Sequence, residues 1–214
     1  MKIIDITGVI EPGMWWFEPP VPKVEFTAIG SLDKEGWVSH AITLSAITGT
    51  YLETGAHVLK NVRTIDEVEA RELVCDAVVA RVKPKNGLEH VTRKELEPAV
   101  SKLRPGDALI IDTGWYRNWN KENFILESPH FDEEAVEMLL EKQISILCSD
   151  MVCYDDPCEP EMPLLRKIFA KGTLILGTVV GLGEITKDRV KLIALPLKLK
   201  GVSASPCRAI VIEE

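Results

Sequence analysis

Short apolar runs with the length and composition of β-strands recur along the chain, separated by glycine, proline and polar residues. Two of them, Cys75–Lys83 and Ala108–Asp112, are rich in residues that favour buried strands. Residues 12–22 hold four prolines and three large aromatic residues, which indicates an ordered loop instead of a strand. Further strands are predicted over residues 2–6, 24–29, 40–47, 144–148, 173–180, 190–199 and 209–212.

Three helices are predicted from residue 92 onward. Thr92 followed by Glu95 has the form of a capping box, which begins a helix that runs to about Leu103 with Pro98 inside it. Asp132 begins a second helix, and the third spans Pro163–Ala170. A β-rich first half followed by alternating strands and helices predicts an α/β fold, a mixed β-rich sheet core with packed helices. No repeat or long linker divides the sequence, so we expect residues 1–214 to form a single domain.

The composition of the chain argues against several functional classes of protein. The formal net charge of −8 argues against a nucleic-acid binder, which would need clustered Lys and Arg. No apolar run reaches the length of a membrane span, and acidic residues interrupt the first residues where a signal peptide would be apolar. We therefore expect a cytoplasmic protein without a membrane partner. The five cysteines, an odd number, are expected to be free thiols.

Residues 47–57, ITGTYLETGAH, place polar side chains in an apolar neighbourhood. If this backbone is extended, Tyr51, Glu53 and His57 point to one face because side chains alternate along a strand. A phenol, a carboxylate and an imidazole on one face would form an acid–base cluster. The alternative is a purely structural pair, in which a buried Glu53 and His57 satisfy each other.

Two other groups of residues have candidate chemistry. Cys148, Cys153 and Cys158 are spaced as a possible metal or redox site, but no further Cys or His pair completes it, which favours partly buried thiols. His40 lies on a predicted strand that leads to the 47–57 segment and could reach the same pocket.

The 47–57 segment is similar to the motif H-x-G-T-H-x-D-x-P-x-H of the cyclase family, the group that includes bacterial kynurenine formamidase. Other segments resemble the family's motifs in the same order: DITGVIEPGM at 5–14, GDALIIDTGW at 106–115, CSD at 148–150, LPLKLKG at 195–201 and SPCRA at 205–209. The resemblance spans nearly the whole chain. It implies the swivelling β/β/α fold of that family.

The resemblance also implies hydrolysis of an amide or cyclic imide-like bond in a small molecule with bound Zn or Mn. The metal ligands of the family carry over poorly onto this sequence. Its His positions fall on Ile47, Tyr51 and Leu165, and its Asp and Glu positions fall on Glu53 and Gly177. Ile, Leu and Gly side chains cannot bind a cation, so too few ligands remain for a catalytic zinc site. We expect the family metal to be lost and no other cofactor to replace it.

Two functions stay open on the sequence alone. One is a metal-free hydrolase of an amide or cyclic amide bond, in which His57 is the acid or base, Glu53 orients it and Tyr51 stabilises an oxyanion. The other is a catalytically inactive homologue that binds a small molecule or has a structural role. Substrate-binding positions, some of them implied by the resemblance, are predicted at Thr50, Trp15, Trp16, Trp115, Asp150 and His40. The resemblance further implies a homodimer or higher oligomer.

Overall fold

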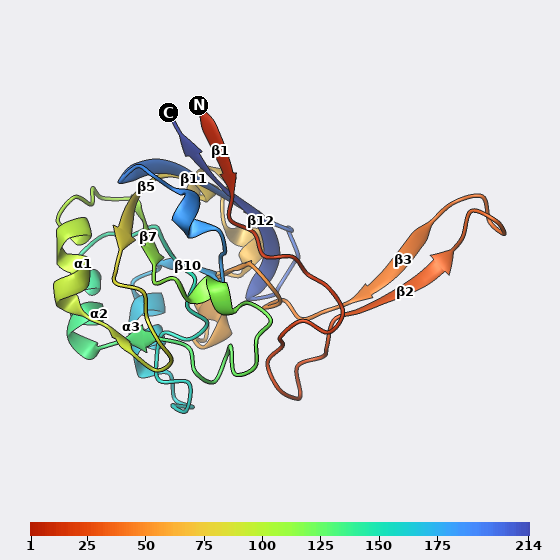
Figure 1. The fold of residues 1–214 in the computed structure, drawn as a ribbon, viewed down its shortest axis with the longest axis horizontal. Helices are drawn as coiled ribbons and strands as arrows, with labels where there is room; N and C mark the ends of the chain where they lie inside the picture. The colour runs from red at the N-terminus through yellow and green to blue at the C-terminus, as the bar shows by residue number, and fades with distance from the viewer.

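A closed mixed β-sheet forms the centre of the molecule in a computed structural model that describes residues 1–214 (Figure 1). Strands β5, β7, β9 and β10 run parallel, and the other pairings are antiparallel. Strand β4 pairs with both β10 and β12, which closes the sheet on itself. The spatial order is β1 (Lys2–Asp5), β12 (Ala204–Glu213), β11 (Arg189–Pro196), β5 (Val74–Arg81), β7 (Ala108–Asp112), β9 (Ile146–Ser149), β10 (Leu174–Gly177) and β4 (Tyr51–Glu53).

Three helices cover the outer face of the parallel strands, stacked on the left of Figure 1: α1 (Arg93–Val100), α2 (Glu133–Leu140) and α3 (Pro163–Ala170). The alternation of side chains along β7 explains the two cores. Leu109 and Ile111 pack with residues of the helices, whereas Ala108 and Ile110 belong to the core enclosed by the sheet. None of the helices, each eight residues long, is long and apolar enough to cross a membrane.

The predicted α/β fold with a β-rich sheet and packed helices is confirmed. The helix over Pro163–Ala170 and the strand over Ala108–Asp112 have the predicted bounds, and Thr92 caps α1 with Glu95 as predicted. The prediction of a strand over residues 40–47 was wrong at its end, because β3 stops at Thr43 and a turn follows. Short elements complete the chain: β6 (His90–Val91), β8 (His130–Phe131) and the 3₁₀ helices η1 (Gly55–His57), η2 (Ile65–Glu67), η3 (Ala70–Leu73), η4 (Trp115–Asn118) and η5 (Leu182–Glu184).

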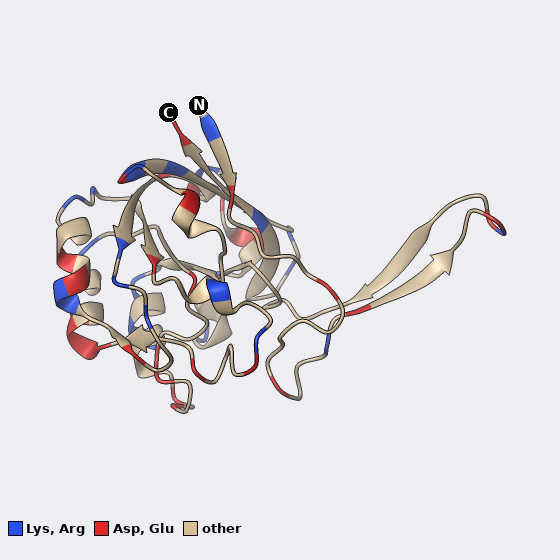
Figure 2. Cartoon of the chain, viewed as in Figure 1, with Lys and Arg blue, Asp and Glu red and all other residues tan.

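Strands β2 (Glu25–Gly30) and β3 (Ser39–Thr43) form a separate two-stranded sheet. Figure 1 shows this hairpin projecting from the body of the molecule, with neither strand joined to the central sheet. Lys, Arg, Asp and Glu are spread over the helices and loops of the body, whereas the hairpin strands are almost free of charge between their base and their tip (Figure 2).

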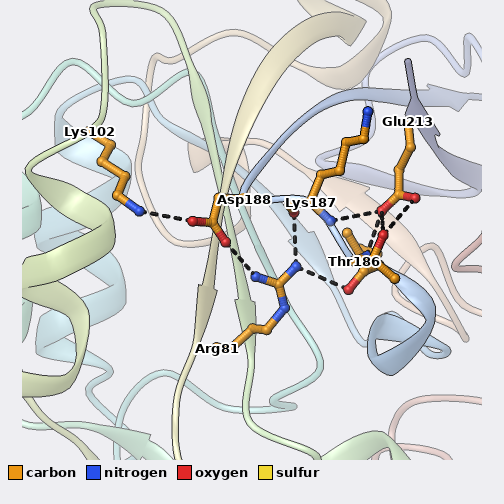
Figure 3. A network of polar contacts seen from close by, with 7 residues as sticks. Arg81, Lys102, Thr186, Lys187, Asp188 and Glu213 are labelled. Atoms are coloured by element: carbon orange, nitrogen blue, oxygen red, sulfur yellow. Dashed lines mark hydrogen bonds and ion pairs between the residues drawn. The ribbon is translucent and has the colours of Figure 1, made fainter.

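A polar network fastens the segment before β11 to the rest of the sheet (Figure 3). Asp188 accepts hydrogen bonds from Arg81 of β5 at 2.9 Å and from Lys102 after α1 at 3.0 Å. Arg81 also donates to the backbone carbonyls of residues 185 and 187. Glu213, near the C-terminus, accepts a hydrogen bond from the backbone N–H of Lys187 at 3.0 Å. These contacts hold β5, β11 and β12 together at one edge.

The interior position of Ile110 leads to a stability prediction. Its side chain is fully buried in the core enclosed by the sheet. Ile110→Ala should lower the free energy of unfolding by about 2–5 kcal/mol, because it removes buried methyl groups and leaves a cavity. Chemical denaturation followed by circular dichroism measures this. Ile3→Ala, at a side chain that is 56% exposed, is the control and should change it by about 0.5 kcal/mol or less. Equal losses in the two variants would contradict the assigned core.

Candidate functional site

A cavity of about 340 Å³ opens beside β4, between the turn that follows it, the N-terminal end of α3 and the loop after β9. Tyr51, Glu53 and His57 all line it, as predicted from their spacing. Most of the lining is apolar, and the apolar side chains include Phe17, Ile47, Met151, Val152, Met162, Leu165 and Ile175. A concave apolar site with a few converging polar groups is the usual form of a small-molecule site.

The local backbone brings Glu53 and His57 together by a different route from the predicted extended chain. Strand β4 ends at Glu53, and the Thr54 side chain then caps the 3₁₀ turn Gly55–His57. This turn leads back toward the strand, so that His57 Nδ1 lies 3.2 Å from Glu53 Oε1. The turn packs closely on α3, where a Cβ at Gly55 would lie 3.3 Å from Phe169. The prediction of an extended backbone through His57 was therefore wrong, although the side chains still share one site.

Burial determines the protonation states of Tyr51, Glu53 and His57. Burial raises the pKa of Glu53 from 4.5 to about 8, so its carboxyl is mostly protonated at neutral pH. Burial, and then the positive charge of Arg166, lowers the pKa of His57 below 6.5. Burial likewise raises the pKa of Tyr51 well above its ordinary value, so its phenol keeps its proton. At neutral pH all three are uncharged. The buried Glu53 Oε1 accepts no hydrogen bond from the chain, and its near polar neighbour is His57 Nδ1 at 3.2 Å.

The positions implied to be metal ligands meet in this one cavity. Ile47, Leu165 and Gly177 line it together with Tyr51 and Glu53. Tyr51 and Gly177 are directly paired on the neighbouring strands β4 and β10. A Cβ at Gly177 would lie 3.1 Å from the Tyr51 ring, so the aromatic ring fills the space beside the missing side chain.

The residues present do not fit the family's metal. Isoleucine, leucine and glycine stand at three of the implied ligand positions, and a Cβ at residue 177 would lie only 3.1 Å from the Tyr51 ring. A catalytic zinc takes three protein ligands, whereas Glu53 and His57 are the two good donors left here. In the whole chain, no group of three or more His, Cys, Asp or Glu side chains is arranged to hold a metal ion.

Thr50 and Asp150 flank the site but do not line the cavity. The Thr50 hydroxyl accepts a hydrogen bond from the Gly8 N–H at 2.9 Å and donates to the Thr178 carbonyl at 2.8 Å. Asp150 accepts three hydrogen bonds, from the Thr113 N–H and hydroxyl and from the Tyr116 N–H. Burial raises the pKa of Asp150 to about 6 against the effect of these bonds. Both side chains thus hold loops around the site in place.

The predicted aromatic positions and His40 also lie outside the cavity lining. Trp15 and Trp16 line a separate groove, and Trp115 is buried in a small aromatic core with its indole N–H donating to the Phe124 carbonyl at 3.0 Å. His40 lies on the projecting hairpin. Their substrate-binding role stays a prediction. The aromatic residue that the structure brings to the cavity is Phe17, in the same loop as the two tryptophans.

The five cysteines are free thiols in the structure, and one of them, Cys153, lines the cavity. Burial raises the pKa of Cys153 to about 12, so it is neither a thiolate nucleophile nor a ready metal ligand near neutral pH. Sequence reasoning missed the loop over residues 151–162, which forms one wall of the cavity. Its Pro157, Pro160 and acidic residues indicate a loop but not its position.

The raised pKa of Glu53 predicts a pH-dependent stability. A carboxyl whose pKa is raised on folding stabilises the folded state fully below about 4.5, and this contribution is lost as pH rises through about 8. Glu53→Gln removes the effect. The free energy of unfolding of the unchanged protein should therefore fall between pH 5 and pH 9, relative to Glu53→Gln, by on the order of a few kcal/mol. Urea unfolding across this range measures it. The exposed Glu122→Gln is the control, and parallel curves for Glu53→Gln and the unchanged protein would contradict the assignment.

Comparison with known proteins identifies a family and a relative that this chain resembles. Residues 4–156, more than half of the chain, match the family model named Cyclase and described as "Putative cyclase". The chain is 24% identical to a kynurenine formamidase of Salinibacter ruber (strain DSM 13855 / M31), across 99% of this chain and 97% of that protein.

Solved structures share the fold over the whole chain. An isatin hydrolase bound to the product analogue thioisatinate superposes with a TM-score of 0.89 at 21% identity, covering 100% of this chain and 93% of that one. A potential metal-dependent hydrolase with cyclase activity gives a TM-score of 0.81 at 21% identity, covering 100% of this chain and 99% of that one. The family expected from the sequence motifs is confirmed: this chain belongs to the cyclase family.

Proposed function

We propose that this protein hydrolyses an amide or cyclic amide bond in a small molecule, without the family's metal, using His57 and Glu53 for acid–base chemistry. The observation that carries the proposal is the meeting of Tyr51, Glu53 and His57 in one mainly apolar cavity, at positions where the family motif has its ligands. The kynurenine formamidase and isatin hydrolase relatives support a substrate of this class, since their names specify a formamide and a cyclic amide.

The shape and lining of the cavity support a compact, largely apolar substrate. Its volume of about 340 Å³ suits a single small aromatic or heterocyclic compound. No Lys or Arg lines it, so it offers no cation to bind an anionic group. Tyr51 and Glu53 lie at its buried end, and His57 is more exposed. A substrate carbonyl is therefore expected to point toward Tyr51.

The protonation state of the Glu53–His57 pair sets the chemistry that it can perform. While Glu53 is protonated, it donates to Nδ1 of neutral His57, and Nε2 carries the ring hydrogen. Once the carboxyl ionises near pH 8, it accepts from Nδ1–H instead and leaves the Nε2 lone pair free. His57 can then accept a proton from water as the water oxygen attacks the carbonyl carbon. The imidazole returns that proton to the nitrogen as the C–N bond breaks.

The Tyr51 phenol supplies the remaining requirement, a donor for the carbonyl oxygen. Its pKa is raised by burial and by the neighbouring Glu53, so the O–H persists over the working range of pH. A donor in a site of low dielectric stabilises the negative charge that develops on the oxygen when water attacks. In the proposal this donor stabilises the oxyanion in place of a metal ion, so the step needs no metal. Tyr51 stands at one of the positions where the family motif has a ligand.

The first test is hydrolysis of N-formylkynurenine and isatin by the purified protein with and without a chelator. The proposal expects hydrolysis of at least one of these compounds, no loss of rate with the chelator, and substoichiometric Zn and Mn by elemental analysis. His57→Ala should lower kcat/KM by about 10²–10⁴ and Tyr51→Phe by about 10²–10³. Lys60→Ala, an exposed neighbour outside the cavity, is the control. Stoichiometric metal, or full activity in His57→Ala, would contradict the proposal.

The second test is the pH profile of the same reaction. Because the base forms when the pair loses its proton, kcat/KM should rise with pH and level off above an apparent pKa of about 8. Glu53→Gln cannot ionise and should lose this rise. Stopped assays from pH 6 to pH 10 measure both profiles. A profile for Glu53→Gln that keeps the same apparent pKa would show that another group is responsible.

A further inference from the structure

The loop over residues 151–162 gives the cavity beside His57 an acidic wall. It has four acidic residues and no Lys or Arg (Figure 2). Three of the four line the cavity, namely Asp155, Asp156 and Glu159. Asp155 is buried and accepts two backbone N–H groups at the start of α3. Asp156 and Glu159 are exposed, so they stand at the mouth of a mainly apolar cavity.

The two carboxylates at the mouth are not paired with a cation. No Lys or Arg side chain forms an ion pair with either of them. Asp156 Oδ1 accepts a hydrogen bond from the Cys158 N–H at 2.8 Å. Glu159 Oε1 accepts one from the Glu161 N–H at 3.1 Å. These bonds orient each carboxylate within the loop and leave its second oxygen free for a ligand.

The two cations of α3 are engaged away from this mouth. Arg166 Nε donates to the Glu161 carbonyl at 2.7 Å, and its guanidinium also donates to the Val58 carbonyl. Lys167 pairs with Glu133 of α2 at 2.7 Å. Neither cation lines the cavity. A positive charge at the mouth is therefore one that a ligand supplies.

The buried end of the cavity also has a polar atom without a partner. Glu53 lines the cavity and is 96% buried, and its Oε1 accepts no hydrogen bond from the chain. Buried polar atoms normally have a hydrogen-bond partner, which a bound ligand would supply here. A ligand that suits both ends has a polar group at the buried end, an apolar body and a positive charge at the mouth.

We propose that the molecule bound in this cavity carries a primary ammonium group, held at the mouth by Asp156 and Glu159. That this molecule is the substrate, with its amide bond beside Tyr51 and His57, rests on the proposed function. An organic cation fits better than a metal ion, because no three His, Cys, Asp or Glu side chains are grouped to hold a metal. Charges of one sign in a cleft attract ligands of the opposite sign and repel those of the same sign. The site therefore selects amides with a cationic substituent over neutral or anionic ones.

Calorimetric titration with three ligands that share one ring tests this binding site without any catalysis. Benzylammonium should bind about 10-fold more tightly than benzyl alcohol, and benzoate should bind most weakly. Asp156→Asn with Glu159→Gln should remove this preference and leave the affinity for benzyl alcohol unchanged. Glu134→Gln with Glu137→Gln removes the same charge from exposed positions of α2 and should keep the preference. Equal affinities of the unchanged protein for the three ligands would overturn the proposal.

The histidines report where the ammonium binds. Asp156 and Glu159 also border a neighbouring hollow that contains His90 and His130. Because the chain has four histidines, their ring signals can be followed by NMR during a titration with benzylammonium. The signals of His57 should shift, while those of His90 and His130 stay in place. Shifts at His90 and His130 alone would overturn the assignment to this cavity.

Hydrolysis separates the cation site from the proposed function. The kcat/KM for 4-(aminomethyl)formanilide should be about 10-fold above that for 4-(hydroxymethyl)formanilide, and Asp156→Asn with Glu159→Gln should remove the difference. Equal hydrolysis of both compounds by the unchanged protein would overturn the selectivity for a cation and leave the proposed function standing. A protein that hydrolyses neither of them, nor N-formylkynurenine or isatin, but binds benzylammonium selectively would contradict the proposed function and support the cation site.

Discussion

The double pairing of β4 is the constraint on which the rest of the site depends. This strand of three residues hydrogen-bonds to β10 on one side and β12 on the other, and it closes the sheet. Closure places Leu52 in the enclosed core and directs Tyr51 and Glu53 to the cavity on the opposite side. Both neighbours come from the last forty or so residues of the chain, so the site is complete only when the N-terminal and C-terminal parts have folded together.

The closed sheet also buries the polar groups of the site, and this burial destabilises the folded state. Glu53 is 96% buried, and its carboxyl has the His57 imidazole as its close polar neighbour. Burial without a full set of hydrogen bonds disfavours the charged form, which is why the carboxyl keeps its proton close to neutral pH. Asp150 shows the contrast within the same protein. It is buried just as deeply but accepts three hydrogen bonds, and its pKa rises less. A buried carboxyl that accepts few hydrogen bonds has a pKa near neutrality. Such a pKa suits proton transfer, but the group does not stabilise the fold.

Local sequence patterns predicted the elements whose formation depends on local signals. The Thr92–Glu95 capping box, the apolar strand over Ala108–Asp112 and the helix that begins at Pro163 all appear where the pattern places them. The gathering of Tyr51, Glu53 and His57 was predicted as well, although for a different backbone. Period-two alternation cannot anticipate a 3₁₀ turn, and here Thr54 caps one immediately after the strand. The cavity wall from residues 151–162 and the reach of Phe17 depend on contacts between distant segments, which no local pattern contains.

The contact between Tyr51 and Gly177 has a consequence for any attempt to rebuild a metal site on this sheet. The two residues are cross-strand partners, and the ring fills the space that a side chain at residue 177 would enter. Any side chain at residue 177 would therefore need the Tyr51 ring to shift. Introducing a glutamate at residue 177 alone would press its Cβ against the Tyr51 ring, so rebuilding the ligand set of the family motif means changing residues 51 and 177 together.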